Sequence, residues 1–191
     1  MAGPIDRQPD KLDYLSPTQF RFGIHQLPKV EFFVQTCNLP GLTMNNTEIP
    51  NPFKNIPVMG EKIEYEDLNL TFLVDEYLEN YLQLHQWLTA IGFPEKREQF
   101  RTHRDVTSNT PASGGTPSVD TINSAVADKA MYSDAYLMIL SNKNNPIVEI
   151  DFKNVFPTSI GGLSFDGGAT DVEYLTCDVT FKYQIYDIRT L

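Results

Sequence analysis

The segment LTCDVTFKYQI, residues 175–185, alternates apolar and polar side chains along its whole length. Successive side chains of a β-strand point to opposite faces of the sheet, so this segment is typical of a strand with one face in the core and one in water. The apolar face would hold Leu175, Cys177, Val179, Phe181, Tyr183 and Ile185. The polar face would hold Thr176, Asp178, Thr180, Lys182 and Gln184.

Comparable patterns predict further strands along the chain, with twelve Phe and nine Tyr adding to their β-propensity. Within Glu61–Asp75, the apolar positions change phase between Tyr65 and Leu68, which indicates a bulge or a strand that passes from one environment to another. The first two strands are expected to form a hairpin. The predicted strands are Thr18–Leu27, Val30–Asn38, Glu61–Asp75, Ala135–Leu140 and Ile147–Lys153.

One amphipathic helix is predicted over Glu76–Ile91, with Asp75 as its N-cap and Gly92 and Pro94 at its end. Its expected apolar stripe is Leu78, Tyr81, Leu82, His85 and Leu88, widened by Tyr77, Leu84 and Ile91. The predicted fold is mainly β: an antiparallel β-sandwich or barrel-like domain, with this helix covering a sheet.

The chain is expected to form one domain over residues 18–191, preceded by an arm over residues 1–17. The arm has three prolines and a small apolar group, which makes it a candidate for docking on a neighbouring subunit. Residues 95–130 are rich in Ser, Thr, Gly and Pro and are predicted to be a surface insertion. The candidate contact residues of the arm are Leu12, Tyr14 and Leu15.

Residues 43–60, TMNNTEIPNPFKNIPVMG, combine three prolines with apolar side chains that are expected to be exposed. Proline lacks the donor that a central strand needs, so the segment is predicted to be an extended ribbon. The ribbon either lies along an edge of its own domain, the alternative that the sequence favours, or reaches another subunit. For the second case the candidate contacts are Pro52, Phe53, Ile56, Val58 and Met59.

The formal net charge of −10 argues against a surface that grips nucleic acid, because such surfaces concentrate Lys and Arg. The acidic excess lies in residues 61–94, with seven acidic and one basic residue, and in residues 131–191, with eight and four. Cys37 and Cys177 lie in apolar strands and are expected to be buried free thiols. No signal peptide or membrane span is expected, so synthesis in a reducing cytoplasm without membrane insertion is predicted.

Signatures of catalysis are missing from the sequence. It contains no HExxH, CxxC, GxSxG or GxxxxGK[ST] motif, and its three histidines fall in a strand, a helix and a loop. We therefore expect no catalytic residue, no metal site and no cofactor. A structural protein is favoured over an enzyme.

The order of the segments carries a resemblance to a known family. A strand ends in the turn CNLPGLTM, a proline-rich ribbon leads into LNLTFLVDE, and a helix with Trp87 follows. Near the end, FPTSIG precedes the last alternating strand. In this order, over residues 18–94 and 131–188, the sequence resembles the tail tube proteins of T-even-like contractile-tailed bacteriophages. That family shares its fold with the haemolysin-coregulated protein of type VI secretion.

The resemblance implies six-subunit rings whose inner strands join into one continuous barrel around a bore. Stacked rings would form a conduit for DNA inside a contractile sheath, with baseplate, tail-terminator and tape measure proteins as further partners. The protein would belong to the virion tail and assemble in the host cytoplasm. DNA would pass an acidic bore without sequence-specific binding, and Glu64, Glu66 and Asp178 are the candidate lumen-facing residues.

Two alternatives remain at this point. One is a tube-initiating or tube-terminating subunit of the same tail, which would share the fold and could explain the 95–130 insertion. The other is a monomeric ligand-binding β-barrel, or a β-sandwich hydrolase, which would be a stable monomer with a pocket.

Overall fold

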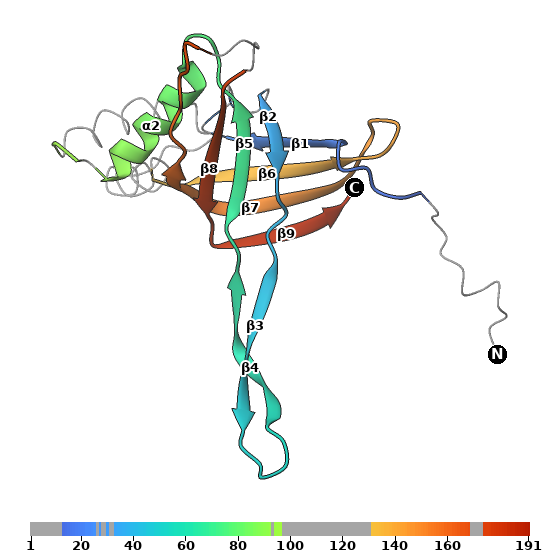
Figure 1. Ribbon diagram of the computed structural model, residues 1–191. Helices are drawn as coiled ribbons and strands as arrows, with labels where there is room; N and C mark the ends of the chain where they lie inside the picture. The colour runs from blue at the N-terminus through green and yellow to red at the C-terminus, as the bar shows by residue number, and fades with distance from the viewer. Residues whose placement is uncertain are drawn as a thin grey trace, which may run out of the picture.

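A computed structural model of the protein describes residues 13–25, 27, 30, 33–92, 94–96, 131–168 and 174–191. This part of the chain forms nine strands and one helix, all strand pairs being antiparallel (Figure 1). The mainly β fold is therefore confirmed, and the described residues contain the one predicted helix. The elements are β1 Phe20–Ile24, β2 Val34–Cys37, β3 Leu42–Ile49, β4 Ile56–Tyr65, β5 Leu68–Leu73, α2 Glu79–Gly92, β6 Ser133–Leu140, β7 Pro146–Ile160, β8 Thr176–Lys182 and β9 Ile185–Thr190.

The long strand β7 joins two layers of the domain. Its first part lies between β6 and β9, and its last part, Phe156–Ile160, pairs with β8. One layer therefore has the order β1-β6-β7-β9 and the other the order β7-β8-β5-β2. In Figure 1 the strands of the second layer cross in front of those of the first.

The hydrophobic core lies between the two layers and beneath α2. The buried positions of β5 and β8 alternate with exposed or half-buried ones, as the opening segment of the sequence predicts. Trp87 of α2 is fully buried, lies against Phe181 of β8 with ring centroids 6.3 Å apart, and donates a hydrogen bond to the Met131 carbonyl. The largest fully buried side chains are Trp87, Phe22, Phe72, Phe152, Phe181, Leu68, Leu70 and Leu84.

The helix begins later, and buries a different face, than the sequence predicts. Leu78 has a left-handed backbone, with φ of 57°, so regular helix begins only at Glu79. The buried Asn80 side chain donates to the Leu73 carbonyl and accepts from the Asp75 amide, which ties the first turn to the end of β5. This anchor turns the face with Asn80, Leu84, Trp87 and Ala90 inward. Leu82 and His85 of the predicted stripe are consequently exposed, and so are Tyr77 and Leu78, which precede the helix.

Two predicted strand arrangements are wrong. β1 pairs with β6 and β2 pairs with β5, so the first two strands do not form a hairpin with each other. The alternating segment 175–185 is also not one strand, because the chain turns at Tyr183 and Gln184 between β8 and β9. Tyr183 therefore lies at a corner of the domain, where three other aromatic rings surround it.

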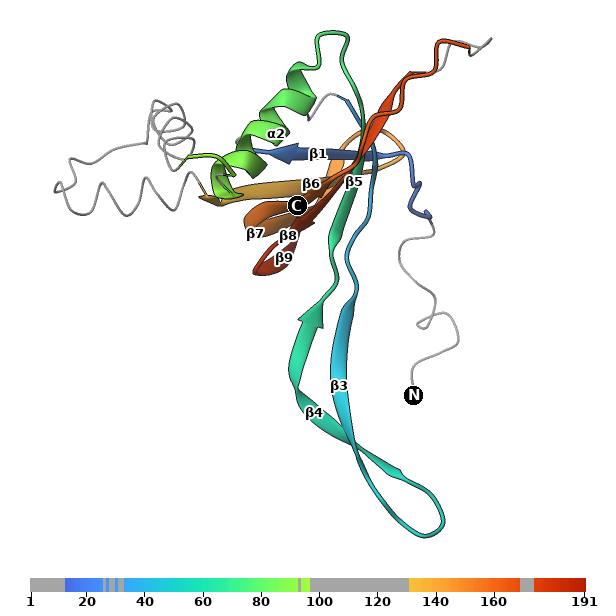
Figure 2. The same ribbon diagram turned by 60° about the vertical axis from the view of Figure 1, so that its left-hand side comes forward.

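The predicted change of environment between Tyr65 and Leu68 is confirmed. β4 ends at Tyr65 in a separate two-stranded sheet with β3, and β5 begins at Leu68 in the main sheet. The β3–β4 hairpin extends away from both layers (Figure 2). The ribbon predicted over residues 43–60 is thus most of this hairpin, and the favoured placement along an edge of its own domain is wrong.

Candidate assembly surfaces

The β3–β4 hairpin exposes an unusual number of large apolar side chains. Every residue of β3 is exposed, and so are eight of the ten residues of β4. A two-stranded ribbon is marginally stable alone, and large exposed apolar surfaces usually mark contacts with other molecules. The exposed large hydrophobic residues of the hairpin are Leu42, Met44, Ile49, Phe53, Ile56, Val58, Met59 and Ile63.

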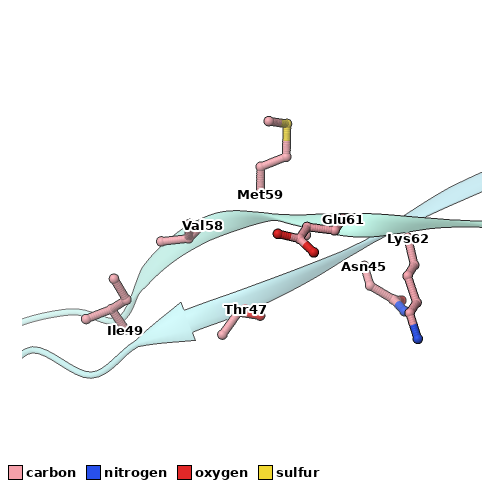
Figure 3. A pocket seen from close by; sticks show the side chains of 8 residues that line it. Asn45, Thr47, Ile49, Val58, Met59, Glu61 and Lys62 are labelled. Atoms are coloured by element: carbon pink, nitrogen blue, oxygen red, sulfur yellow. The ribbon is translucent and has the colours of Figure 1, made fainter.

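A bulge in the middle of the hairpin rotates its two ends relative to each other. Met44 pairs with Ile63 but Asn46 pairs with Met59, so β4 has two extra residues at this point. Gly60 lies in the bulge, where a Cβ atom would collide with the Asn45 carbonyl oxygen. Figure 3 shows an open hollow here, with Met59 pointing to the opposite side from Asn45 and Lys62.

The structure places the predicted contact residues of the ribbon between the bulge and the tip of the hairpin. Ile56, Val58 and Met59 lie on β4, and Pro52 and Phe53 lie in the turn between the strands. In the arm, Tyr14 and Leu15 are exposed, while Leu12 lies outside the described residues. The arm up to residue 12 and nearly all of the 95–130 insertion also lie outside them.

The outer face of the β8-β5-β2 sheet is polar. Thr71 faces Asp178 across the β5–β8 pair and donates a hydrogen bond to its carboxylate at 2.6 Å. Thr180 donates to Asn69, the next pair on the same face, at 3.1 Å. Lys182 ends the row and forms an ion pair with Asp67 at 2.8 Å. The face is therefore a row of hydroxyl and amide groups with few free charges.

The three candidate lumen carboxylates occupy different places. Asp178 lies on the polar sheet face, but Glu64 lies on the hairpin, where it accepts a hydrogen bond from Asn45 at 3.1 Å. Glu66 lies between β4 and β5 and accepts from the Gly41 amide at 3.2 Å. The structure does not bring these side chains into one cluster.

Both ends of this polar sheet are open in the part of the chain that the structure describes. β2 pairs with β5 on one side only, and Phe156–Ile160 of β7 pairs with β8 on one side only. Open edges of this kind expose backbone donors and acceptors that can pair with another chain.

A cluster of aromatic side chains surrounds the base of the hairpin, and sequence reasoning missed it. Tyr65 at the end of β4 contacts Tyr183 and Tyr186 edge-on, with ring centroids 5.8 and 5.7 Å apart. Phe152 of β7 lies beneath both of these tyrosines. Burial raises the pKa of Tyr183 to about 12. In the sequence, the only indication of this cluster is three tyrosines in apolar strand patterns. Packing in the core explains each of these tyrosines equally well.

Within the described ranges, neither the cysteines nor the acidic and histidine side chains form a recognisable catalytic or metal site. Cys37 and Cys177 are free thiols, as expected, but only Cys177 is fully buried and Cys37 is half-buried. Burial raises the pKa of Cys37 to about 12 and also raises the pKa of Cys177. Among the described residues, no three His, Cys, Asp or Glu side chains gather as a metal ion would require. No helix in the same part of the chain is long and apolar enough to cross a bilayer.

Several solved structures share this fold. A chain of the anti-feeding prophage baseplate matches with a TM-score of 0.58 and 14% identity, over 94% of this chain and 97% of the other. A chain of the anti-feeding prophage cap, described as tube-terminating, matches with a TM-score of 0.54 and 13% identity, over 99% and 100%. A chain of the PVC sheath-tube complex, from an extracellular contractile injection system, matches with a TM-score of 0.50 and 12% identity, over 93% of each chain.

The sequence itself gives a family assignment. A comparison with curated proteins finds no match. The family model described as phage tail tube protein matches residues 13–189, which is nearly the whole chain. The match includes the polar sheet, the hairpin and the helix described above. The chain therefore belongs to the phage tail tube protein family, whose members are structural components of tails.

Proposed function

We propose that this protein is the main subunit of a tail tube, in which six copies form a ring and rings stack into a hollow conduit for DNA. In this arrangement the protein has no catalytic role. The polar β8-β5-β2 face lines the bore, and the β3–β4 hairpin reaches a neighbouring subunit in the next ring.

The observation that carries the proposal is the exposed apolar hairpin. Phe53 is 97% exposed and Met59 is 79% exposed in the isolated chain. Burying a large apolar side chain stabilises a contact by about 1.5–3 kcal/mol, so a hairpin with eight such residues can supply much of a ring-to-ring interface.

Ring closure uses the open edges of the polar sheet. If β2 of one subunit pairs with Phe156–Ile160 of the next, each ring gains a continuous barrel and the polar sheet keeps no open edge. The apolar inner face of each sheet stays in its own domain, because Phe72, Val179 and Phe181 are already buried there.

The chemistry of the polar face suits a bore through which DNA slides. Asp178 is negative, and Lys182 is paired with Asp67, so the described residues of this face offer phosphate no unpaired cation. Like charge repels the DNA backbone, and hydroxyl groups such as Thr71 and Thr180 bind it only weakly. Glu64 and Glu66, on the hairpin and at its base, would add negative charge where successive rings meet.

The remaining partners follow from the same role. A contractile sheath would surround the tube, and baseplate and terminator proteins would bind its two ends. Tape measure protein and then DNA would occupy the bore. The subunit would assemble into the virion tail in the host cytoplasm.

Negative-stain electron microscopy of the purified protein over a range of concentrations tests the proposal. Hollow rods that lengthen with concentration are expected for the main tube subunit. Single rings that never stack would instead indicate an initiating or terminating subunit of the tail. A uniform monomer at every concentration, with or without baseplate components, would contradict a tube role.

A further inference from the structure

The hairpin leaves the domain through two short linkers, and a tyrosine hydroxyl holds each of them. Residues 38–41 connect β2 to β3, and residues 66–67 connect β4 to β5. The Tyr186 hydroxyl donates to the Pro40 carbonyl at 3.2 Å in the first linker. The Tyr183 hydroxyl donates to the Glu66 carbonyl at 3.0 Å in the second.

Both tyrosines belong to the body of the domain. Tyr183 lies in the turn between β8 and β9, and Tyr186 lies on β9 opposite Phe152 of β7. Their rings pack on Phe152 beneath and on Tyr65 of the hairpin above. Tyrosine hydroxyls are protonated at neutral pH, and burial, which raises the pKa of Tyr183 to about 12, keeps this hydroxyl a donor in alkaline solution as well.

Most other bonds at the base of the hairpin join one linker to the other. Asn38 donates to the Asp67 carbonyl and accepts from the Asn69 amide, and the Glu66 amide donates to the Gly41 carbonyl. The bonds to Asn69 tie the first linker to the start of β5, and the others fix the spacing of the two strands. The bonds of this group do not reach β9 or the layer to which it belongs.

The ion pair between Lys182 and Asp67 also connects the base to the body. Both of its side chains are about half exposed, at 55% and 40%, so water and salt screen it. The two hydroxyl bonds therefore hold the linkers to the other layer of the domain, through the β8–β9 turn and β9.

We propose that Tyr183 and Tyr186 are positioning residues that set the direction of the hairpin in the free subunit, so that it is aimed at its partner before assembly. The consequence for assembly rests on the proposed tube function, but the direction itself does not. A hairpin fixed in advance loses less conformational entropy on docking, which favours fast addition of subunits.

Distance measurement between two spin labels tests the direction without requiring assembly. Labels on cysteines introduced by Lys54→Cys in the hairpin turn and Lys143→Cys in the β6–β7 turn would report the angle of the hairpin. Both sites are exposed, whereas burial raises the pKa of the natural thiols and slows their labelling. Labelled protein is diluted into unlabelled protein so that only distances within one chain are recorded.

The variant is Tyr183→Phe with Tyr186→Phe, which removes the two hydroxyls and keeps the rings. Each net hydrogen bond contributes about a few-fold to tenfold to an equilibrium, so other hairpin directions should gain roughly tenfold to a hundredfold in population and broaden the distance distribution. The matched control is Tyr174→Phe, a tyrosine that is 80% exposed and outside the cluster, and its distribution should equal that of the parent.

An unchanged distribution in the double variant, at both low and high salt, would overturn the proposal. If the double variant does not fold, the two single variants are measured, and each should broaden the distribution less. Slower tube growth in the double variant would link direction to assembly. A broadened distribution in a protein that forms no tubes would leave the positioning role intact and instead contradict the proposed function.

Discussion

Replacing Phe53 and Met59 with serine removes apolar surface from the hairpin without touching the core. Both side chains are almost free of contacts in the isolated chain, with exposed fractions of 97% and 79%. Substitutions at such positions change the free energy of unfolding by about 0.5 kcal/mol or less. The double variant should therefore fold with an unchanged melting temperature.

The effect on assembly should be large because these same side chains have nearly all of their surface still to bury. Scaled by their exposed fractions, the two losses amount to about 3–5 kcal/mol per ring-to-ring contact. At 1.36 kcal/mol for each factor of ten, the critical concentration for tube growth should rise roughly a hundredfold to several thousandfold.

Pelleting by ultracentrifugation over a concentration series measures this critical concentration. Phe165→Ser is the matched control, since Phe165 is 74% exposed but lies outside the hairpin, and it should assemble as the parent does. A double variant that assembles at the parent concentration would refute the reasoning that the hairpin holds the rings together.

Three further predictions concern stability and the hairpin. Trp87→Ala should lower the free energy of unfolding by about 3–5 kcal/mol in denaturant titrations, because the side chain is fully buried; a loss below about 1 kcal/mol would contradict its place in the core. Gly60→Ala should impair tube growth at unchanged melting temperature, because a Cβ there meets the Asn45 carbonyl, whereas Gly162→Ala, with open space around it, should do neither. Because the pKa of Tyr183 is raised from 10.0 to about 12 in the folded protein, the unfolded state releases this proton first as the pH rises. The contribution of Tyr183 to the free energy of unfolding is therefore present below pH 10 and lost between pH 10 and 12. Tyr183→Phe should show a shallower fall over that window in unfolding titrations, and an equal slope would contradict the shift.

The sequence predicts best where one physical effect dominates. The strict alternation from Thr176 to Lys182 is compatible only with a strand that has one buried face, and the structure confirms this strand as β8. The change of phase between Tyr65 and Leu68 likewise marks the place where the chain leaves the hairpin for the main sheet.

Prediction fails where a tertiary contact decides between patterns of similar strength. The start of the helix has apolar side chains on more than one side, so the periodicity alone does not decide which side packs against the core. The buried Asn80, bonded to Leu73 and Asp75, selects one of them, and a polar residue gives no hydrophobic signal. The pairing of strands also cannot be read from the sequence pattern. β1 pairs with β6, more than a hundred residues away, and not with the next strand along the chain.

The candidate site is only partly visible in the sequence. Prolines and apolar residues mark the hairpin, but whether it lies on its own domain or projects from it depends on what the rest of the domain already covers. The tyrosines at its base show no pattern in the sequence, because Tyr65 at the end of β4 meets Tyr183 and Tyr186 only after the β8–β9 turn and β9 are in place.

An electron cryomicroscopy map of the assembled tube, at a resolution that traces the backbone, measures the subunit contacts themselves. The expected map has β2 of each subunit hydrogen-bonded to Phe156–Ile160 of its neighbour, with Thr71 and Asp178 facing the bore. A map in which each subunit keeps both of these edges unpaired, or turns Asp178 toward the outside of the particle, would contradict the account.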